Sequence, residues 1–204
     1  MTRALRRALF LLGSLAALAS PIDAQVCRGV ASESPVWFAM QYGRAAKHAS
    51  VHGADIAWQL DQGLLLFTDA NVTMYPQPDP ARGRVAVGMG IEVGEFRGVG
   101  VCTTFGFERE RIGDLQVQRI PTGIALGWSR PLAGVARRIG FTVEPFYVHG
   151  HERIERFGHT SNFVSGRAGM IYLARGYLVG LKYEHAFDAD ARWHATARDG
   201  FTFN

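Results

Sequence analysis

Residues 84–93 read RVAVGMGIEV, a stretch in which every second side chain is apolar. One face of this stretch is uninterruptedly apolar and consists of Val85, Val87, Met89, Ile91 and Val93. The other face carries small or charged side chains. A period of two is that of an extended strand, whose successive side chains point to opposite sides of a sheet. The stretch therefore predicts a β-strand with one continuous apolar face.

The same alternation recurs along the chain in similar segments that are separated by turn-like stretches. These further segments are 36–43, 54–60, 63–75, 99–107, 120–128, 141–149, 163–172, 177–185 and 196–204. Together with 84–93 they make ten candidate strands. Eight strands remain if the weaker first or last hairpin stays outside the sheet.

The connections between these segments are of two kinds that alternate strictly. Gly-bearing and mostly short connections are 60–63, 94–98, 130–140 and 173–176, of which 130–140 is long for its class. Longer or more charged connections are 44–50, 76–83, 108–118, 150–162 and 186–195. An up-and-down barrel with short turns at one rim and longer loops at the other shows this alternation.

The continuous apolar side of each strand is expected to face outward and to contact lipid acyl chains. Beyond the N-terminal segment no apolar run is long enough for a spanning helix, so a membrane would be crossed by strands. Closure is required because each unsatisfied backbone group in hydrocarbon costs several kcal/mol. We therefore predict an all-β, closed antiparallel barrel. A soluble periplasmic lipocalin-like binding protein is the alternative.

The N-terminus carries a secretory pattern. Arg3, Arg6 and Arg7 precede an apolar run and a small-residue cleavage site at Ala24. Residues 1–24 are predicted to be a signal peptide and residues 25–204 the barrel domain. Cleavage removes three arginines and one aspartate and lowers the formal net charge from +4 to +2. Because the exported chain has no basic block, we expect no nucleic-acid partner.

The alternation of the C-terminal residues Phe201 to Asn204 resembles the terminal strand signal that the barrel-assembly machinery reads. Over the mature sequence the chain resembles the small outer-membrane β-barrel families, of the porin A transmembrane-domain or opacity-protein type. The resemblance implies an outer-membrane, cell-envelope location, a porin-like fold and a structural or surface-binding role. It also implies a narrow or plugged lumen, contact with outer-membrane lipid and lipopolysaccharide, and a monomeric state. No specific activity and no cofactor are implied.

Strand parity assigns a set of ionisable side chains to the lumen. They are Asp55, Asp69, Glu92, Glu144, Arg167, Lys182 and Glu184. The predicted lumen ionic cluster comprises Glu92, Glu144, Arg167, Lys182 and Glu184. Buried charges must be paired and hydrogen-bonded. The cluster is interpreted either as an ionic plug or as a gate or proton path.

Cys27 and Cys102 are the two cysteines of the sequence, and both survive signal cleavage. An oxidising compartment permits one disulfide between them. Cys102 points inward by parity, so this bond would hold the N-terminal segment at the periplasmic mouth. Neither cysteine has metal-ligand spacing, and no metal site is predicted.

The sequence assigns one catalytic alternative. Residues 159–162 read HTSN, which resembles the His-x-Ser motif of outer-membrane lipid A deacylases. This resemblance implies His159 as the base and Ser161 as the nucleophile. No acid follows about a dozen residues later to orient the histidine, and the next one is Glu184.

Basic residues of the longer connections are candidates for contact with lipopolysaccharide phosphates. They are Arg44, Lys47, Arg82, Arg109, Arg111, Arg153, Arg156 and Arg192. Glutamates stand between them at Glu108, Glu110, Glu152 and Glu155, which favours ordinary solvated loops.

Overall fold

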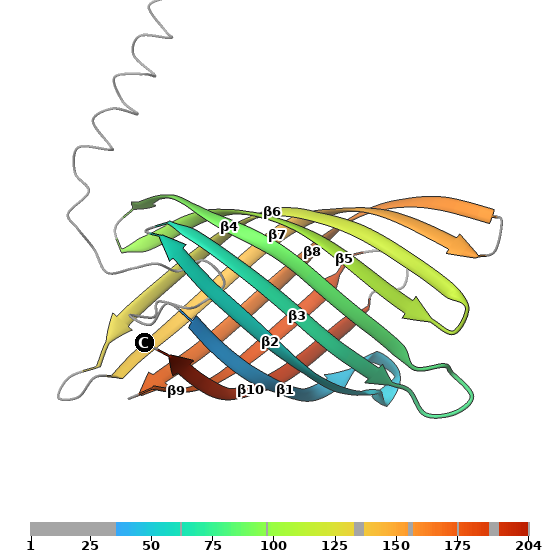
Figure 1. Cartoon of the computed structure of the whole chain (residues 1–204), viewed down its shortest axis with the longest axis horizontal. Coiled ribbons are helices and arrows are strands. Elements are labelled where there is room, and N and C mark those ends of the chain that lie inside the picture. Colours follow the sequence, from blue (N-terminus) through green and yellow to red (C-terminus); the bar gives the residue numbers. More distant parts are fainter. Residues whose placement is uncertain are drawn as a thin grey trace, which may run out of the picture.

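The computed structural model describes residues 36–61, 63–96, 98–132, 137–154, 157–174, 176–187 and 192–203. Within these ranges the chain forms ten antiparallel strands that wind into a closed barrel (Figure 1). The strands are β1 (Val36–Ala45), β2 (Ser50–Asp61), β3 (Leu64–Met74), β4 (Arg82–Phe96), β5 (Val99–Ile112), β6 (Leu115–Pro131), β7 (Arg137–Ile154), β8 (Phe157–Ala174), β9 (Tyr177–Ala186) and β10 (Trp193–Phe203). The predicted signal peptide and Cys27 lie outside the described residues.

Each strand pairs with its neighbours in sequence, and β1 pairs with β10 to close the ring. The closing register places Val36 opposite Phe203 and Ala45 opposite His194. Because the first and last strands are both in the ring, the ten-stranded prediction is confirmed and the eight-stranded alternative is wrong. Glycine is required along this seam: a Cβ on Gly200 would collide with the Phe38 carbonyl oxygen.

The barrel wall is taller on one side than on the other. The five contiguous strands β4–β8, which we call the long wall, have 14 to 18 residues each. The other five, β9, β10, β1, β2 and β3, form the short wall, with 10 to 12 residues each. We call the end where β1 begins and β10 ends the terminal rim, and the opposite end the distal rim.

Two predicted loops are strand instead. Residues 108–112, 115–118, 150–154 and 157–162 continue the β5–β6 and β7–β8 ladders, which extend the long wall at the distal rim (Figure 1). A tight turn at Gly113, in the left-handed region with φ +58°, joins β5 to β6. In these ranges polar residues occupy both faces of the strand. The hydropathy therefore does not alternate, although the backbone stays extended, and the ranges were predicted to be loops. The connection 130–140 is also shorter than predicted, because β6 ends at Pro131 and β7 begins at Arg137.

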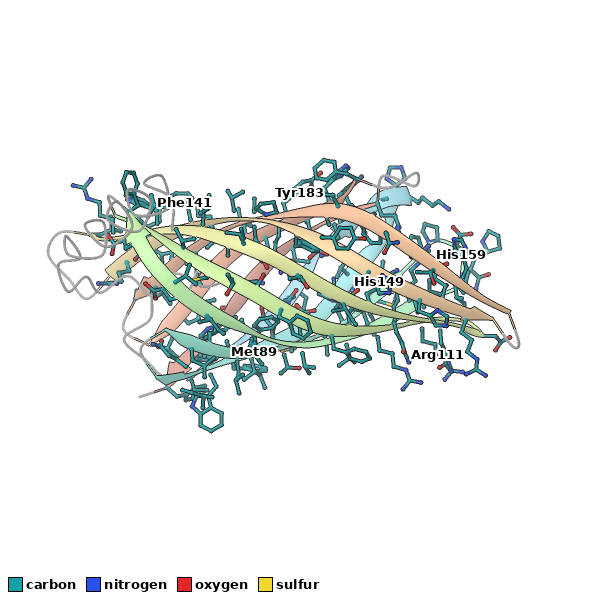
Figure 2. The ribbon with its side chains drawn as sticks, turned by 90° about the horizontal axis from the view of Figure 1, so that it is seen from above. Met89, Arg111, Phe141, His149, His159 and Tyr183 are labelled. Atoms are coloured by element: carbon teal, nitrogen blue, oxygen red, sulfur yellow. The ribbon has the colours of Figure 1, made fainter. Side chains whose placement is uncertain are left out.

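Apolar side chains cover the outside of the barrel. Val85 and Met89 are 53% and 40% exposed, whereas Glu144 and Lys182 are each only 4% exposed. Figure 2 shows Met89, Phe141 and Tyr183 on the outer surface. The predicted orientation of the two strand faces is therefore confirmed. A lipocalin-like soluble barrel would have the reverse distribution.

Aromatic rings mark both ends of this apolar surface. Near the terminal rim, Trp128 stacks on Phe141 with 5.7 Å between ring centroids. On the distal side of the short wall, Tyr183 stacks on Trp193 at 6.5 Å. Such rows are typical of the two interfaces of a membrane barrel. Among the residues described, no helix is long and apolar enough to cross a membrane.

The interior is filled in layers. Closest to the terminal rim is an apolar cluster of buried side chains, made of Trp37, Ala39, Ala57, Leu65, Phe67, Cys102, Ala125, Ile171 and Leu178. The Phe67 ring fits there because Gly88 faces it, and a Cβ on Gly88 would collide with that ring. Charged side chains fill the next layer, and a cavity lies above them.

Candidate functional site: the charged lumen

The middle of the lumen is crossed by an ion pair between opposite strands. Arg84 on β4 and Glu184 on β9 lie 3.4 Å apart, from Nη1 to Oε1. In the closed ring β4 and β9 are separated by the same number of strands in either direction, so they stand diametrically opposite. Arg167 on β8 meets the other Glu184 oxygen, with 3.0 Å between Nη2 and Oε2. A single carboxylate therefore joins two arginines across the full width of the barrel.

Further pairs extend this bridge in both directions. Arg84 Nη2 lies 2.8 Å from Glu108 Oε2, and Arg119 Nη1 lies 3.0 Å from Glu108 Oε1 and 2.7 Å from Glu110 Oε2. On the other side, Arg167 Nη1 donates to Glu144 Oε2 at 2.9 Å. The result is a continuous, alternating chain of charges from Glu110 to Glu144, which we call the lumen network.

The lumen network is largely shielded from water. Its arginine side chains are 8% to 10% exposed, and those of its carboxylates 6% to 13%. Thr104 donates a 2.7 Å hydrogen bond to the second Glu144 oxygen. Desolvating such groups costs several kcal/mol per ion, which only close opposite charges and further hydrogen bonds offset. The alternation of signs along the network satisfies this condition.

A second group of polar contacts lies inside the short wall. Asp69 on β3 accepts hydrogen bonds from Lys182 Nζ at 3.2 Å and from Gln41 Nε2 at 2.8 Å. Its other oxygen accepts from Asn71 Nδ2 at 2.9 Å. Arg198 on β10 pairs with Asp55 on β2 at 3.1 Å, across β1. Except for the Asn71 contact, which lies within β3, these contacts connect strands that are not direct neighbours and so occupy the lumen at this level.

The structure thus brings together only part of the predicted ionic cluster. Glu144, Arg167 and Glu184 are in the lumen network. Lys182 instead pairs with Asp69. Glu92 lies apart near the terminal rim, where it is opposite Cys102 in the β4–β5 register.

Several lumen residues are absent from the predicted cluster. They are Arg84, Glu108, Glu110, Arg119 and Arg198. Glu108 and Glu110 were assigned to a solvated loop, which is wrong, since both are buried. A cue exists in the sequence, because Gly-Asp at 113–114 is a two-residue hairpin signal.

A cavity of about 100 Å³ lies on the distal side of the lumen network. Its floor includes Arg84, Glu108 and Glu184, and His194 Nε2 lies 3.6 Å from Glu184 Oε2. Aromatic rings and arginines line its wall: Arg82 lies over the Tyr75 ring at 5.0 Å, and Arg192 over the Phe163 ring at 5.8 Å. The cavity is therefore a polar recess at the distal mouth.

His159 and Ser161 do not form a catalytic pair in this structure. Both are on β8, but no hydrogen bond between them is present among the described residues, and the buried Ser161 hydroxyl has no partner there. Ser161 Oγ instead lies against Gly150, whereas His159 is exposed. Glu184, the acid that follows in sequence, is held by Arg84 and Arg167. This geometry offers no activated nucleophile.

The two remaining site predictions concern cysteines and metals. Cys102 is fully buried in the apolar cluster, and its thiol is not free. Cys27 lies outside the described residues, so the disulfide stays a prediction. Within the described ranges, no group of three or more His, Cys, Asp or Glu side chains is placed to hold a metal ion.

Comparison with known proteins does not identify a family for this chain. No family model and no curated protein matches the sequence. Among solved structures, the chain is similar to the N-terminal β-barrel domain of Pseudomonas aeruginosa OprF, with 10% identity and a TM-score of 0.38. The similarity covers 82% of this chain and 96% of that one. The fold is an outer-membrane-type β-barrel. This assignment rests on the strand pairing and the outward apolar face described above.

Proposed function

We propose that the chain is an integral outer-membrane protein whose lumen is closed to ions and whose role is structural or surface-binding. The observation that carries this proposal is the combination of an apolar exterior with the Arg84–Glu184 pair across the lumen. An apolar exterior of this kind is stable against acyl chains and costly in water. This bridge divides the lumen at its level, and the Lys182–Asp69 and Arg198–Asp55 pairs occupy the short-wall side.

The terminal rim is proposed to face the periplasm and the distal rim the outside. Barrels of this class keep short turns on the periplasmic side and place their longer extensions outside. Here three of the terminal-rim connections are tight, and the long wall extends at the distal rim. The cavity above the lumen network would then open toward the outside.

Ion conduction would require two layers of the interior to open. An ion would have to separate Arg84 from Glu184 and then pass the apolar cluster around Trp37. Removing one partner of a buried ion pair costs about 3 to 5 kcal/mol because the other charge is left uncompensated, and pulling the two partners apart inside the lumen is unfavourable for the same reason. We therefore interpret the lumen network as a plug that holds the two walls together.

The experiment is reconstitution of the mature chain in lipid. Membranes are washed with alkaline carbonate, and the purified protein is run on a gel with and without boiling. We expect the protein to stay with the membrane and to show heat-modifiable migration. In planar bilayers we expect no sustained current. Release by carbonate would overturn the membrane assignment, and a steady current through the wild-type protein would overturn the closed lumen.

A further inference from the structure

The outer face of the long wall changes character above the apolar surface. Residues 107–112 read FERERI and are a continuous part of β5. Glu108 and Glu110 face inward and are buried in the lumen network. The same alternation places Arg109 and Arg111 on the outside, where both are exposed. The glutamates that stand between these arginines in sequence are therefore on the other side of the wall in space.

Neighbouring strands add to this outward charge. In the β6–β7 register, Gln118 is opposite His151 and Gln116 is opposite Arg153, and all four side chains are exposed. Figure 2 shows Arg111 and His149 near the distal rim. We call Arg109, Arg111, Gln118, His149, His151 and Arg153 the cationic face. Over this part of β5–β8 the described outward positions include no carboxylate.

The guanidinium groups of Arg109 and Arg111 are held in place by hydrogen bonds that do not neutralise their charge. Arg109 Nη2 donates to Gln116 Oε1 at 2.9 Å, and Arg111 Nε donates to the Gly113 carbonyl oxygen at 3.1 Å. Both acceptors are neutral, so each guanidinium keeps its full positive charge. On β7, the contact of 2.7 Å between His149 Nδ1 and Asn162 Oδ1 fixes the imidazole on the same surface. The two preorganised guanidinium groups of Arg109 and Arg111, bonded to neutral acceptors, are suited to an anion.

The position of the cationic face along the barrel axis indicates which anion it binds. On β5 the outward residue before Arg109 is Phe107, and on β7 the outward residue before His149 is Tyr147. One step of two residues along a strand is about 7 Å. The donors therefore begin directly beyond the aromatic edge of the apolar surface. In a membrane, this is the level of lipid headgroups and their phosphates.

We propose that the cationic face binds the phosphate groups of a membrane lipid headgroup, a phosphate-bearing glycolipid of the outer leaflet. This inference rests on the proposed membrane location and orientation. Arginine matches phosphate oxygens with two parallel hydrogen bonds, and two arginines in one strand face can bind two phosphates or one phosphate from two sides. The aromatic rings below contact the acyl chains of the same lipid.

The test compares two double variants that remove the same charge. Arg109→Gln/Arg111→Gln alters the cationic face. Arg44→Gln/Lys47→Gln removes two positive charges from the distal rim of the short wall, where Lys47 is paired with Asp79. Each protein is reconstituted in phosphatidylcholine nanodiscs with a minor fraction of lipid A. Retention of lipid A is measured by native mass spectrometry and by titration.

We expect the cationic-face variant to bind lipid A roughly thirtyfold more weakly, since each surface basic residue contributes about 1 kcal/mol toward anionic lipid. The short-wall variant should bind like the wild type. Added inorganic phosphate should compete only weakly, because it lacks the acyl contacts. Equal losses in both variants would show generic charge attraction and overturn the proposal, as would no loss in the first. Heat-modifiable migration of each variant tests separately whether the barrel is folded in the membrane. A failure of the proposed function is thereby distinguished from a failure of lipid binding alone.

Discussion

The long and short walls of this barrel share an apolar outer surface but end differently. On the short wall, the outward face runs from Tyr177 through Leu181 to the aromatic pair Tyr183 and Trp193, and the strands then end. On the long wall, the outward face passes Phe107 and continues as the cationic face. The apolar outer surface of the long wall therefore ends before its strands end. The end of this surface is set by side-chain chemistry and not by strand length.

Inside the barrel, the carboxylate of Glu184 links the two walls. Glu184 belongs to the short wall, whereas its partners Arg84 and Arg167 belong to the long wall. The other contacts described mostly stay within one wall, such as Arg119 with Glu110, or Lys182 with Asp69. The predictions below test this difference, beginning with the largest expected effect.

Glu184→Gln should destabilise the barrel most. It keeps the shape of the side chain but leaves Arg84 and Arg167 buried with one charge partner fewer, which costs about 3 to 5 kcal/mol. The measurement is urea unfolding in lipid vesicles, followed by gel migration. Glu92→Gln, near the terminal rim and outside the network, is the control and should have a much smaller effect. Similar losses for both variants would mean that the walls are not joined through Glu184.

A charge placed on the outer surface should locate the membrane boundary. Met89→Arg introduces an arginine in the middle of the apolar surface of β4 and should cost about 2 to 4 kcal/mol. Gln118→Arg, beyond that surface on β6, should cost about 0 to 1 kcal/mol. Both values come from the same urea titration. An equal cost at the two positions would contradict the boundary drawn between Phe107 and Arg109.

The exposed ion pair at the distal rim should contribute least. The side chains of Lys47 and Asp79 are 70% and 45% exposed and lie 3.2 Å apart. Such pairs contribute about 0.2 to 1 kcal/mol and are weakened by salt. Lys47→Gln should therefore change the unfolding free energy slightly at low salt and not at all at high salt. A loss as large as that of Glu184→Gln would remove the distinction between buried and exposed pairs.

The sequence predicts the strands well because their signal is local. Each apolar stretch, such as 84–93, alternates within a few residues, and this alternation is enough to place a strand and both of its faces. Where polar residues occupy both faces, as at Glu108 to Arg111, the hydropathy pattern carries no strand signal, and the two hairpin ends were taken as loops. Only the turn at Gly113 and Asp114 marks the hairpin there.

The pairing of the lumen charges could not be predicted from the sequence. Parity places Glu144, Arg167, Lys182 and Glu184 on the inside, but it does not tell which of them meet. Arg84 and Glu184 are one hundred residues apart in sequence and become neighbours only because the sheet closes into a ring of this diameter. Contacts across a lumen depend on strand number and register around the whole ring, which no local pattern contains.

The seam between β1 and β10 also constrains the order in which the barrel folds. Val36 pairs with Phe203, so almost the entire described chain lies between the two partners that complete the ring. Until the last strand has been synthesised, every intermediate has two strand edges with unpaired backbone groups, which are templates for aggregation. Long-range pairing of this kind also folds slowly. The ring therefore cannot close before β10 has been synthesised, and the open strand edges must be protected until then.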